Sequence, residues 1–269
     1  MDKGIILSGF TPVRREPSEK SEMTSQVLFG ETFDILESGK EWSLIKSDFD
    51  GFEGYISSQG IYRLFDTLYT AAGKQIACNQ VTPVIRLKTN QQILLPAGSV
   101  APIIRDSRFE INGEFFGVNN HQDFLLPDSR VSIEKIAGLL ISVPYLWGGR
   151  CGFGFDCSGL SQFLSRVRGF HLPRDSYQQA LTGENVNFIH EALPGDLAFF
   201  DNMEGEINHV GIFLEQGRLI HASGYVRIDR IDQQGIFNME KGKYSHHLRV
   251  IKRPKNTSSS PGEPQGIID

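Results

Sequence analysis

The stretch Phe155-Asp156-Cys157-Ser158-Gly159-Leu160 decides how this chain of 269 residues is interpreted. Apolar residues follow at the spacing of one helix face, namely Leu160, Phe163, Leu164 and Val167. Cys157 is therefore predicted to lie in the first turn of a helix, where free N–H groups and the helix dipole favour an anion, with Asp156 as the cap. A cysteine placed there beside an imidazole is expected to have its pKa pulled from about 8.5 to roughly 3.5–7.5. The sequence thus predicts a reactive thiolate at Cys157.

Two histidines, His209 and His221, lie on the two strands of a predicted β-hairpin. The length of the connecting loop decides whether their side chains can meet. A two-residue turn would place the rings on opposite faces, whereas a three-residue loop over 215–217, with Gly217 left-handed, pairs Gly211 with His221. We predict the three-residue loop, which puts both rings on one face and about 7–8 Å apart at the backbone.

These three residues fit the pattern of nucleophile, base and orienter. His209 is predicted to take the proton of Cys157, and His221 to fix the tautomer and orientation of His209. The backbone N–H of Cys157 and the hydroxyl of Tyr145 are predicted to hold the oxyanion of the reaction intermediate. Two other interpretations stay open: the histidines could be satisfied polar residues on a sheet face, or zinc ligands together with Cys157.

Six motifs in one order resemble the NlpC-type cell-wall peptidases, the NlpC/p-sixty family. The motifs are Pro144-Tyr145-Leu146-Trp147-Gly148-Gly149, Asp156-Cys157-Ser158-Gly159-Leu160, Leu172-Pro173-Arg174-Asp175-Ser176-Tyr177-Gln178-Gln179, Pro194-Gly195-Asp196-Leu197, Asn208-His209-Val210-Gly211 and Leu219-Ile220-His221-Ala222. The resemblance covers roughly residues 131 to 252. It implies a compact papain-like fold and cleavage of peptide bonds in peptidoglycan stems, commonly the bond between γ-D-glutamate and a diamino acid.

The expected fold class is α+β, with a papain-like catalytic domain preceded by two small SH3-like β-barrels. Residues 1–63 alternate apolar and polar positions between turn signals, which predicts a barrel, and their motifs resemble bacterial SH3-like domains. Residues 64–128 resemble a second, degenerate copy. Residues 129–253 form the expected catalytic domain, which opens with an amphipathic helix, and residues 254–269 are expected to be a disordered tail.

The two SH3-like domains together with Asp175-Ser176 resemble the YkfC-like subgroup of this family. That resemblance implies short murein peptides with a free N-terminal L-Ala, whose ammonium needs an acceptor and whose γ-D-glutamate carboxylate needs donors. Asp175 and Ser176 are predicted to supply these groups, although Asp175 could equally cap a helix that begins at Ser176. Tyr55 and Glu22 of the first domain are predicted to complete the amine pocket. The other predicted substrate-binding residues are Tyr145, Asp156 and Ser158.

Composition narrows the range of partners. The net charge is −5 and the isoelectric point is near 5.8, which argues against nucleic acid or an anionic membrane as partner. The three cysteines show no disulfide or zinc spacing, so no metal and no cofactor is expected. No signal peptide is evident, which favours a cytoplasmic location, or a periplasmic or secreted one if a signal has been removed. The sequence leaves the oligomeric state open.

The predicted function is that of a cysteine endopeptidase acting on the γ-D-glutamyl-L-diamino acid bond of peptidoglycan-derived peptides, in cell-wall recycling. The alternative from another class is a catalytically inert binding protein, in which the tandem SH3-like barrels hold a cell-wall peptide and the papain-like cleft carries out no reaction. A third interpretation, amidase or acyltransferase chemistry on another acyl group, uses the same cysteine and histidine.

Overall fold

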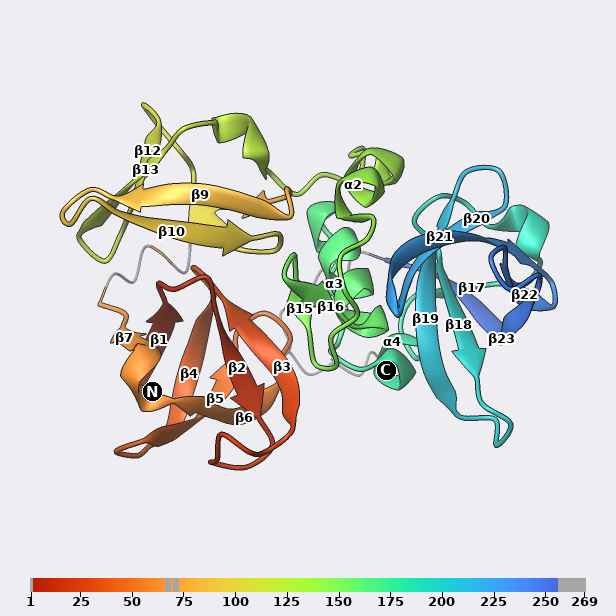
Figure 1. The fold of residues 1–269 in the computed structure, drawn as a ribbon, viewed down its shortest axis with the longest axis horizontal. Helices are drawn as coiled ribbons and strands as arrows, with labels where there is room; N and C mark the ends of the chain where they lie inside the picture. Colours follow the sequence, from red (N-terminus) through yellow and green to blue (C-terminus); the bar gives the residue numbers. More distant parts are fainter. Residues whose placement is uncertain (1, 66–68, 70–72, 256–269) are drawn as a thin grey trace, which may run out of the picture.

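The structure is a computed structural model that describes residues 2–65, 69 and 73–255. Within this part of the chain there are two seven-stranded sheets, one from each end of the sequence, with three smaller sheets between them. Figure 1 shows the helices in the middle of the molecule, between the two N-terminal units and the C-terminal sheet. The predicted α+β class is confirmed, with strands far outnumbering helices.

The first unit is a seven-stranded antiparallel sheet in the order β3-β2-β6-β5-β4-β1-β7. Its side chains alternate between a buried face, which includes Val13, Phe33 and Ile45, and a face toward solvent, as in a sheet with one covered side. Its elements are β1 (Asp2–Ile6), β2 (Phe10–Arg14), β3 (Met23–Leu28), β4 (Thr32–Ser38), β5 (Trp42–Ser47), β6 (Glu53–Ser57), the 3-10 helix η1 (Ser58–Gly60) and β7 (Ile61–Arg63).

The second unit contains a four-stranded sheet, β10-β9-β13-β12, and a three-stranded sheet, β11-β8-β14. Its core includes Phe109 and Phe116 and is continuous with Ile5, Leu7 and Phe29 of the first unit. The two units therefore share one apolar core. The elements are β8 (Lys74–Ala77), β9 (Val81–Arg86), β10 (Gln91–Pro96), β11 (Val100–Pro102), β12 (Arg108–Ile111), β13 (Glu114–Val118), η2 (His121–Asp123) and β14 (Phe124–Leu125).

The C-terminal unit sets three helices against a sheet in the order β17-β23-β18-β19-β20-β21-β22. Because β22 also pairs with β23, six of these strands close into a ring. The elements are α2 (Ile133–Leu140), β15 (Arg150–Cys151), β16 (Gly154–Phe155), α3 (Cys157–Val167), α4 (Ser176–Gln179), β17 (Glu184–Val186), η3 (Ile189–Glu191), β18 (Leu197–Asp201), β19 (Ile207–Leu214), β20 (Arg218–Ser223), β21 (Tyr225–Asp232), β22 (Gly235–Asn238) and β23 (Lys243–Arg253).

Helix α3 begins at Cys157, as the sequence predicted. Asp156 is its N-cap residue, and the Asp156 carboxylate accepts the N–H of Gly159 at 2.7 Å. A Cβ atom at Gly159 would lie 2.1 Å from the carbonyl oxygen of Gly149, so only glycine allows this turn to sit against the preceding loop. The predicted amphipathic helix is also present as α2, which buries its expected apolar face against α3 and the sheet.

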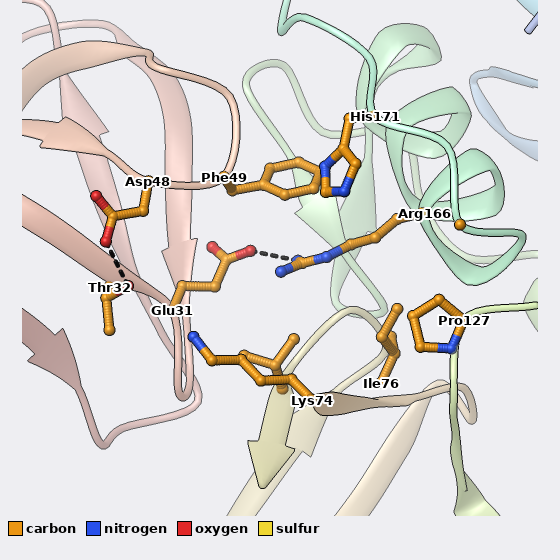
Figure 2. Close-up of a pocket in the computed structure, with 11 residues that line it drawn as sticks. Glu31, Thr32, Asp48, Phe49, Lys74, Ile76, Pro127, Arg166 and His171 are labelled. Atoms are coloured by element: carbon orange, nitrogen blue, oxygen red, sulfur yellow. Dashed lines mark hydrogen bonds and ion pairs between the residues drawn. The ribbon is translucent and has the colours of Figure 1, made fainter. Parts of the chain in front are cut away.

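A buried ion cluster joins the first unit to α3. The Glu31 carboxylate accepts hydrogen bonds from Arg150 at 3.2 Å and from Arg166 at 2.5 Å, and the ring of Phe49 lies against both guanidinium groups. Figure 2 shows the Glu31 carboxylate joined to the Arg166 guanidinium in the lining of a cavity of about 390 Å³ where the three units meet. Burial alone would raise the pKa of Glu31, but the two arginine charges outweigh it and hold that pKa below its usual value. The cluster fixes the first unit against the helix that carries Cys157.

Part of the predicted tail lies outside the described residues, because the description ends at Lys255. Cys151 is buried completely in the short strand β15, whose partner β16 leads into α3. Among residues 2–65, 69 and 73–255, no helix combines the length and the apolar character needed to cross a bilayer.

Candidate active site

A cleft of about 670 Å³ opens between the first unit and the C-terminal unit, with Cys157 in its wall. Seven of the ten predicted site residues line it together: Cys157, Tyr145, Asp156, Ser158, Asp175, Ser176 and Glu22. Tyr55 is not among the lining residues, although it follows Glu53 by two positions on the same face of β6 and Glu53 does line the cleft. The two histidines lie behind this wall, on β19 and β20.

The hairpin of β19 and β20 has the predicted three-residue loop. Leu214 pairs with Arg218 and Gly211 pairs with His221, while Gly217 has a left-handed backbone with φ of 65°. The Nε2 atom of His209 therefore lies 2.9 Å from Nδ1 of His221, with the two rings nearly perpendicular. The predicted pairing of the two histidines on one face is confirmed.

A carboxylate that sequence reasoning missed continues this chain of contacts. Nε2 of His221 lies 3.1 Å from Oδ2 of Asp229 on β21. Arg227 donates to both oxygens of Asp229, at 2.7 and 3.1 Å. Period-two alternation along β21 in the sequence Arg227-Ile228-Asp229 was the available signal, because polar residues at alternate positions of a strand share one face.

The expectation of a low pKa at Cys157 was wrong. The thiol is buried, and burial raises its pKa to about 12, helped by the nearby charge of Asp156. The N–H groups of Val210 and Ser158 act in the opposite direction, but loss of hydration outweighs them because a bare thiolate is poorly stabilised away from water. Within the described part of the chain, no hydrogen bond joins the Cys157 sulfur to an imidazole nitrogen. The structure therefore holds a neutral thiol beside the strand of His209.

His209 lies in a stack of histidines. Its ring centroid is 4.2 Å from that of His246 on β23, and the two planes are 22° apart. Burial is the main cause that lowers the pKa of His209 well below 6.5, and the neighbouring His221 and His246 add to it. His246 packs on the predicted base, and burial lowers its own pKa to about 4.

Asp156 and Ser158 support the wall through Arg174. The two oxygens of Asp156 accept the N–H groups of Gly148 and Gly159 and both terminal nitrogens of the Arg174 guanidinium. The Ser158 hydroxyl accepts another hydrogen bond from Arg174, at 2.8 Å. Arg174 was not predicted to have a role. Its buried ion pair with Asp156 fixes the start of α3. The acceptor capacity of Asp156 is largely used within the protein.

Asp175 stands at the N-cap position of the short helix α4, and the side chain of Gln178 accepts its backbone N–H. Its own carboxylate forms no ion pair with any residue that the structure describes. Because it is half-buried, loss of hydration raises its pKa above the usual 3.8. The charge of Arg174 only partly offsets this loss of hydration, so the carboxylate favours a positively charged ligand.

The first unit contributes the opposite wall. The indole N–H of Trp147 donates to the Glu22 carboxylate at 2.7 Å, and Arg15 pairs with the same carboxylate at 2.8 Å. Trp147 is 62% exposed and bridges the two walls at the cleft through this hydrogen bond. Sequence reasoning also missed Phe52 and Glu53, which lie in the loop before β6 and at its start.

No group of three or more His, Cys, Asp or Glu side chains is arranged to hold a metal ion among the described residues. Cys78 and Cys151 are free and buried, and loss of hydration raises the pKa of both thiols, to about 12 and about 11. Both cysteines are therefore small buried side chains of the core.

Two family models match this chain. Residues 142–249 match the NlpC/P60 family, and residues 13–61 match the bacterial dipeptidyl-peptidase SH3 domain. Among curated proteins, the γ-D-glutamyl-L-lysine dipeptidyl-peptidase of Bacillus subtilis is 28% identical over 215 residues, which cover 74% of this chain and 71% of that protein. A protein of the same name from Bacillus cereus is 30% identical over 151 residues, 55% of this chain and 43% of that one.

Solved structures show the same fold. A crystal structure of an NlpC/P60 family protein from Bacillus cereus superposes with a TM-score of 0.80 at 16% identity, covering 93% of this chain and 99% of that one. An NlpC/P60 endopeptidase from Photobacterium damselae subsp. piscicida has a TM-score of 0.68 at 18% identity, covering 92% of this chain and 70% of that one. The arrangement of all three units is thus shared with the first of these proteins.

Proposed function

Because the chain carries an NlpC/P60 domain behind a bacterial dipeptidyl-peptidase SH3 domain and is a cysteine peptidase, we propose that it cleaves the bond between γ-D-glutamate and an L-diamino acid in short peptidoglycan peptides. The names of the two Bacillus relatives support this choice of bond. We further propose that the substrate has a free N-terminal L-Ala and that the enzyme acts in the cytoplasm on peptides released during wall turnover.

The observation that carries the substrate proposal is the placement of two carboxylates on opposite walls of the cleft that holds Cys157. Asp175 belongs to the C-terminal unit and Glu22 to the first unit. Asp175 forms no ion pair with a described residue, although the charge of Arg174 lies near it, and Glu22 pairs with the exposed Arg15. An ammonium group bound between the two would gain charge-assisted hydrogen bonds and would relieve the desolvation of Asp175. A peptide with a free amine supplies such a group.

The donors in the cleft suit the carboxylate of γ-D-glutamate. Arg15 offers a guanidinium at the cleft, and Ser176 offers a hydroxyl that makes no hydrogen bond with another described residue. A planar guanidinium matches a carboxylate in two parallel hydrogen bonds, which gives orientation as well as affinity. These groups would place the γ-carbonyl of the substrate near Cys157.

The proposed reaction uses Cys157 in the wall of the cleft and His209 behind it. The Cys157 thiol gives its proton to His209 as its sulfur attacks the γ-carbonyl carbon, and the N–H of Cys157 and the Tyr145 hydroxyl stabilise the oxyanion. Burial raises the pKa of Tyr145 to about 12, so its hydroxyl stays protonated and can donate. His209 passes the proton to the leaving amine as the C–N bond breaks. Water then hydrolyses the thioester, with His209 as its base, and the Cys157 thiol is restored.

In the unliganded protein the sulfur and the imidazole are not hydrogen-bonded, and both groups favour their neutral forms. Catalytic hydrogen bonds are often long before substrate binds and shorten in the complex. Proton transfer is therefore expected to accompany attack, instead of preceding it in a standing thiolate–imidazolium pair.

The experiment is incubation with L-Ala-γ-D-Glu-L-Lys and chromatographic detection of released lysine. Release by the wild type and none by Cys157→Ala supports the proposal. Binding of the peptide without release at high enzyme concentration would favour the inert binding protein. Acetylation of the L-Ala amine is expected to abolish cleavage, and undiminished cleavage of the acetylated peptide would remove the ammonium pocket from the proposal.

A further inference from the structure

We propose that Asp229 is a positioning residue that fixes the tautomers of both active-site histidines, so that His209 presents an unprotonated Nδ1 to the Cys157 thiol. The catalytic consequence rests on the proposed peptidase function, whereas the arrangement of protons is a property of the free protein. The inference adds a third member to the chain of groups behind the nucleophile.

Strand register places the three side chains on one diagonal. Gly211 of β19 pairs with His221 of β20, and Leu219 of β20 pairs with Asp229 of β21. His209, His221 and Asp229 therefore each lie one diagonal step apart on the same face of three neighbouring strands. The steps are closed by contacts of 2.9 Å between the two imidazoles and 3.1 Å between His221 and the carboxylate. All three side chains are buried, so no bulk water competes for these positions.

The carboxylate is the only member whose hydrogen-bonding role is fixed in advance. Arg227 grips both oxygens of Asp229, and Glu240 holds Arg227 from the solvent side at 2.9 Å. Burial would raise the pKa of Asp229, but its hydrogen bonds to His221 and Arg227 outweigh that and lower it to about 2. At neutral pH Asp229 is thus an ion that can only accept.

The remaining protons follow one by one. Since Asp229 only accepts, Nε2 of His221 must carry the hydrogen between them. A neutral imidazole has one N–H, so Nδ1 of His221 is an acceptor and Nε2 of His209 must donate to it. That leaves Nδ1 of His209 without a hydrogen, which is the state a base needs. Burial lowers the pKa of both histidines, so the neutral forms apply at pH 7.

Without the carboxylate, two coupled neutral imidazoles have two directions of donation. In the reverse direction His221 donates from Nδ1 to His209, whose own hydrogen then sits on Nδ1 and blocks proton transfer from Cys157. Hydrogen-bond geometry between the rings is the same in both directions, so the rings alone select neither. Asp229 makes the productive direction the one that satisfies every buried donor and acceptor.

The test is nitrogen NMR of protein labelled with ¹⁵N-histidine at pH 7, which distinguishes a protonated from a bare ring nitrogen. The wild type is expected to show His209 and His221 both protonated at Nε2. His209 protonated at Nδ1 would overturn the proposal. In Asp229→Asn the amide can donate as well as accept, so we expect the reversed tautomer to appear and kcat to fall roughly 10- to 100-fold with KM within about twofold.

Asp232→Asn is the matched control, because Asp232 lies on the same strand but is exposed and accepts hydrogen bonds from Tyr244 and from the backbone N–H of Gln234, neither of which contacts a histidine of the site. It should change neither the spectrum nor kcat. The ¹⁵N spectrum can be recorded without turnover. An inactive wild type with the expected tautomers would therefore refute the proposed peptidase function but not the proposed role of Asp229 in fixing the tautomers. An Asp229→Asn protein that keeps both the wild-type spectrum and kcat would refute the inference, and if that variant does not fold the wild-type spectrum decides.

Discussion

The two walls of the cleft differ in how they use their charged side chains. In the C-terminal unit, Asp156 and Asp229 are each gripped by an arginine of the same unit, Arg174 and Arg227, and are buried. In the first unit, Arg15, Glu22 and Glu53 lie exposed at the cleft. In the C-terminal unit, the charged side chains therefore form buried ion pairs that fix the positions of the reacting groups. In the other wall, the charged side chains form exposed pairs, Arg15 with Glu22 and Lys46 with Glu53, which a ligand can reach.

This difference separates reaction from recognition. A change behind the catalytic wall should lower kcat, because it disturbs groups that act only in the transition state. A change in the wall of the first unit should raise KM and leave kcat close to that of the wild type. Asp175 is the exception, since among the described residues it lines the cleft from the C-terminal unit without an ion pair to an arginine.

The largest effect is expected for Cys157→Ala. Removal of the sulfur eliminates covalent attack, so kcat should fall by at least about 10⁴-fold, as when other enzymes lose their nucleophile. Because the Cys157 side chain does not hold Asp175 or Glu22, the Kd of the peptide measured by calorimetry should stay within about twofold. Turnover within tenfold of the wild type would contradict the role of Cys157 as nucleophile. Both walls of the cleft would then serve binding alone.

The junction between the walls is tested next, by Glu31→Gln. The substitution leaves Arg150 and Arg166 buried without their counter-ion, which costs about 3–5 kcal/mol in comparable sites. We expect a Tm roughly 6–20 °C lower in a thermal scan. The pKa of Glu31 is lowered in the fold, so its contribution is present above the ordinary value of 4.5 and is lost as pH falls. The gap in Tm between the two proteins should therefore narrow below pH 4.5.

Glu19→Gln is the control for this experiment, because Glu19 forms a 3.4 Å ion pair with Arg14 and its side chain is 74% exposed. Exposed pairs add little to stability, so its Tm should match that of the wild type. Equal effects of the two substitutions would mean that the buried cluster is no more important than a surface pair.

Sequence reasoning recovered the catalytic wall better than the wall opposite. The start of α3 and the pairing of His209 with His221 follow from helix periodicity and loop parity, which are local properties of the chain. The Glu31 cluster joins residues more than 100 positions apart, and no periodicity reports such a contact. The raised pKa of Cys157 could not be predicted for a related reason. Desolvation of the thiol depends on all residues packed around it, whereas the helix dipole can be inferred from the helix alone.

Glu22→Gln should give the third largest effect. The amide keeps the size and the hydrogen bond from Trp147 but removes the charge that would hold an ammonium. Hydrogen bonds to charged groups contribute about 1.5–3 kcal/mol, so KM for L-Ala-γ-D-Glu-L-Lys should rise roughly 10- to 100-fold while kcat changes little. With the N-acetylated peptide as a comparison, the variant and the wild type should be equally poor. A fall in kcat at unchanged KM would place Glu22 in the reaction instead.

The dependence of kcat and KM on pH below neutrality also tests the separation between reaction and recognition. His209 acts as a base and its pKa is lowered well below 6.5, with His221 and His246 packed against it. It therefore stays unprotonated as pH falls, and kcat/KM should remain flat through pH 6.5 and decline only at lower pH. Asp175, whose pKa is raised above 3.8, is the other group that loses its active form on acidification. In Asp175→Asn, kcat should still decline at low pH as in the wild type, because His209 is unchanged. KM should be higher than that of the wild type at every pH of the profile.

The smallest effect is expected for Tyr55→Phe. Tyr55 lies on the same face of β6 as Glu53 but one step outside the lining of the cleft, and its hydroxyl makes no hydrogen bond with another described residue. If it reaches the substrate amine on binding, the loss of one neutral hydrogen bond corresponds to about 0.5–1.5 kcal/mol, or roughly a two- to tenfold rise in KM. Stability should not change, since no internal contact of the hydroxyl is lost. An effect as large as that of Glu22→Gln would show that the first unit closes further over the cleft when peptide binds, and that its wall is less fixed than the one carrying Cys157.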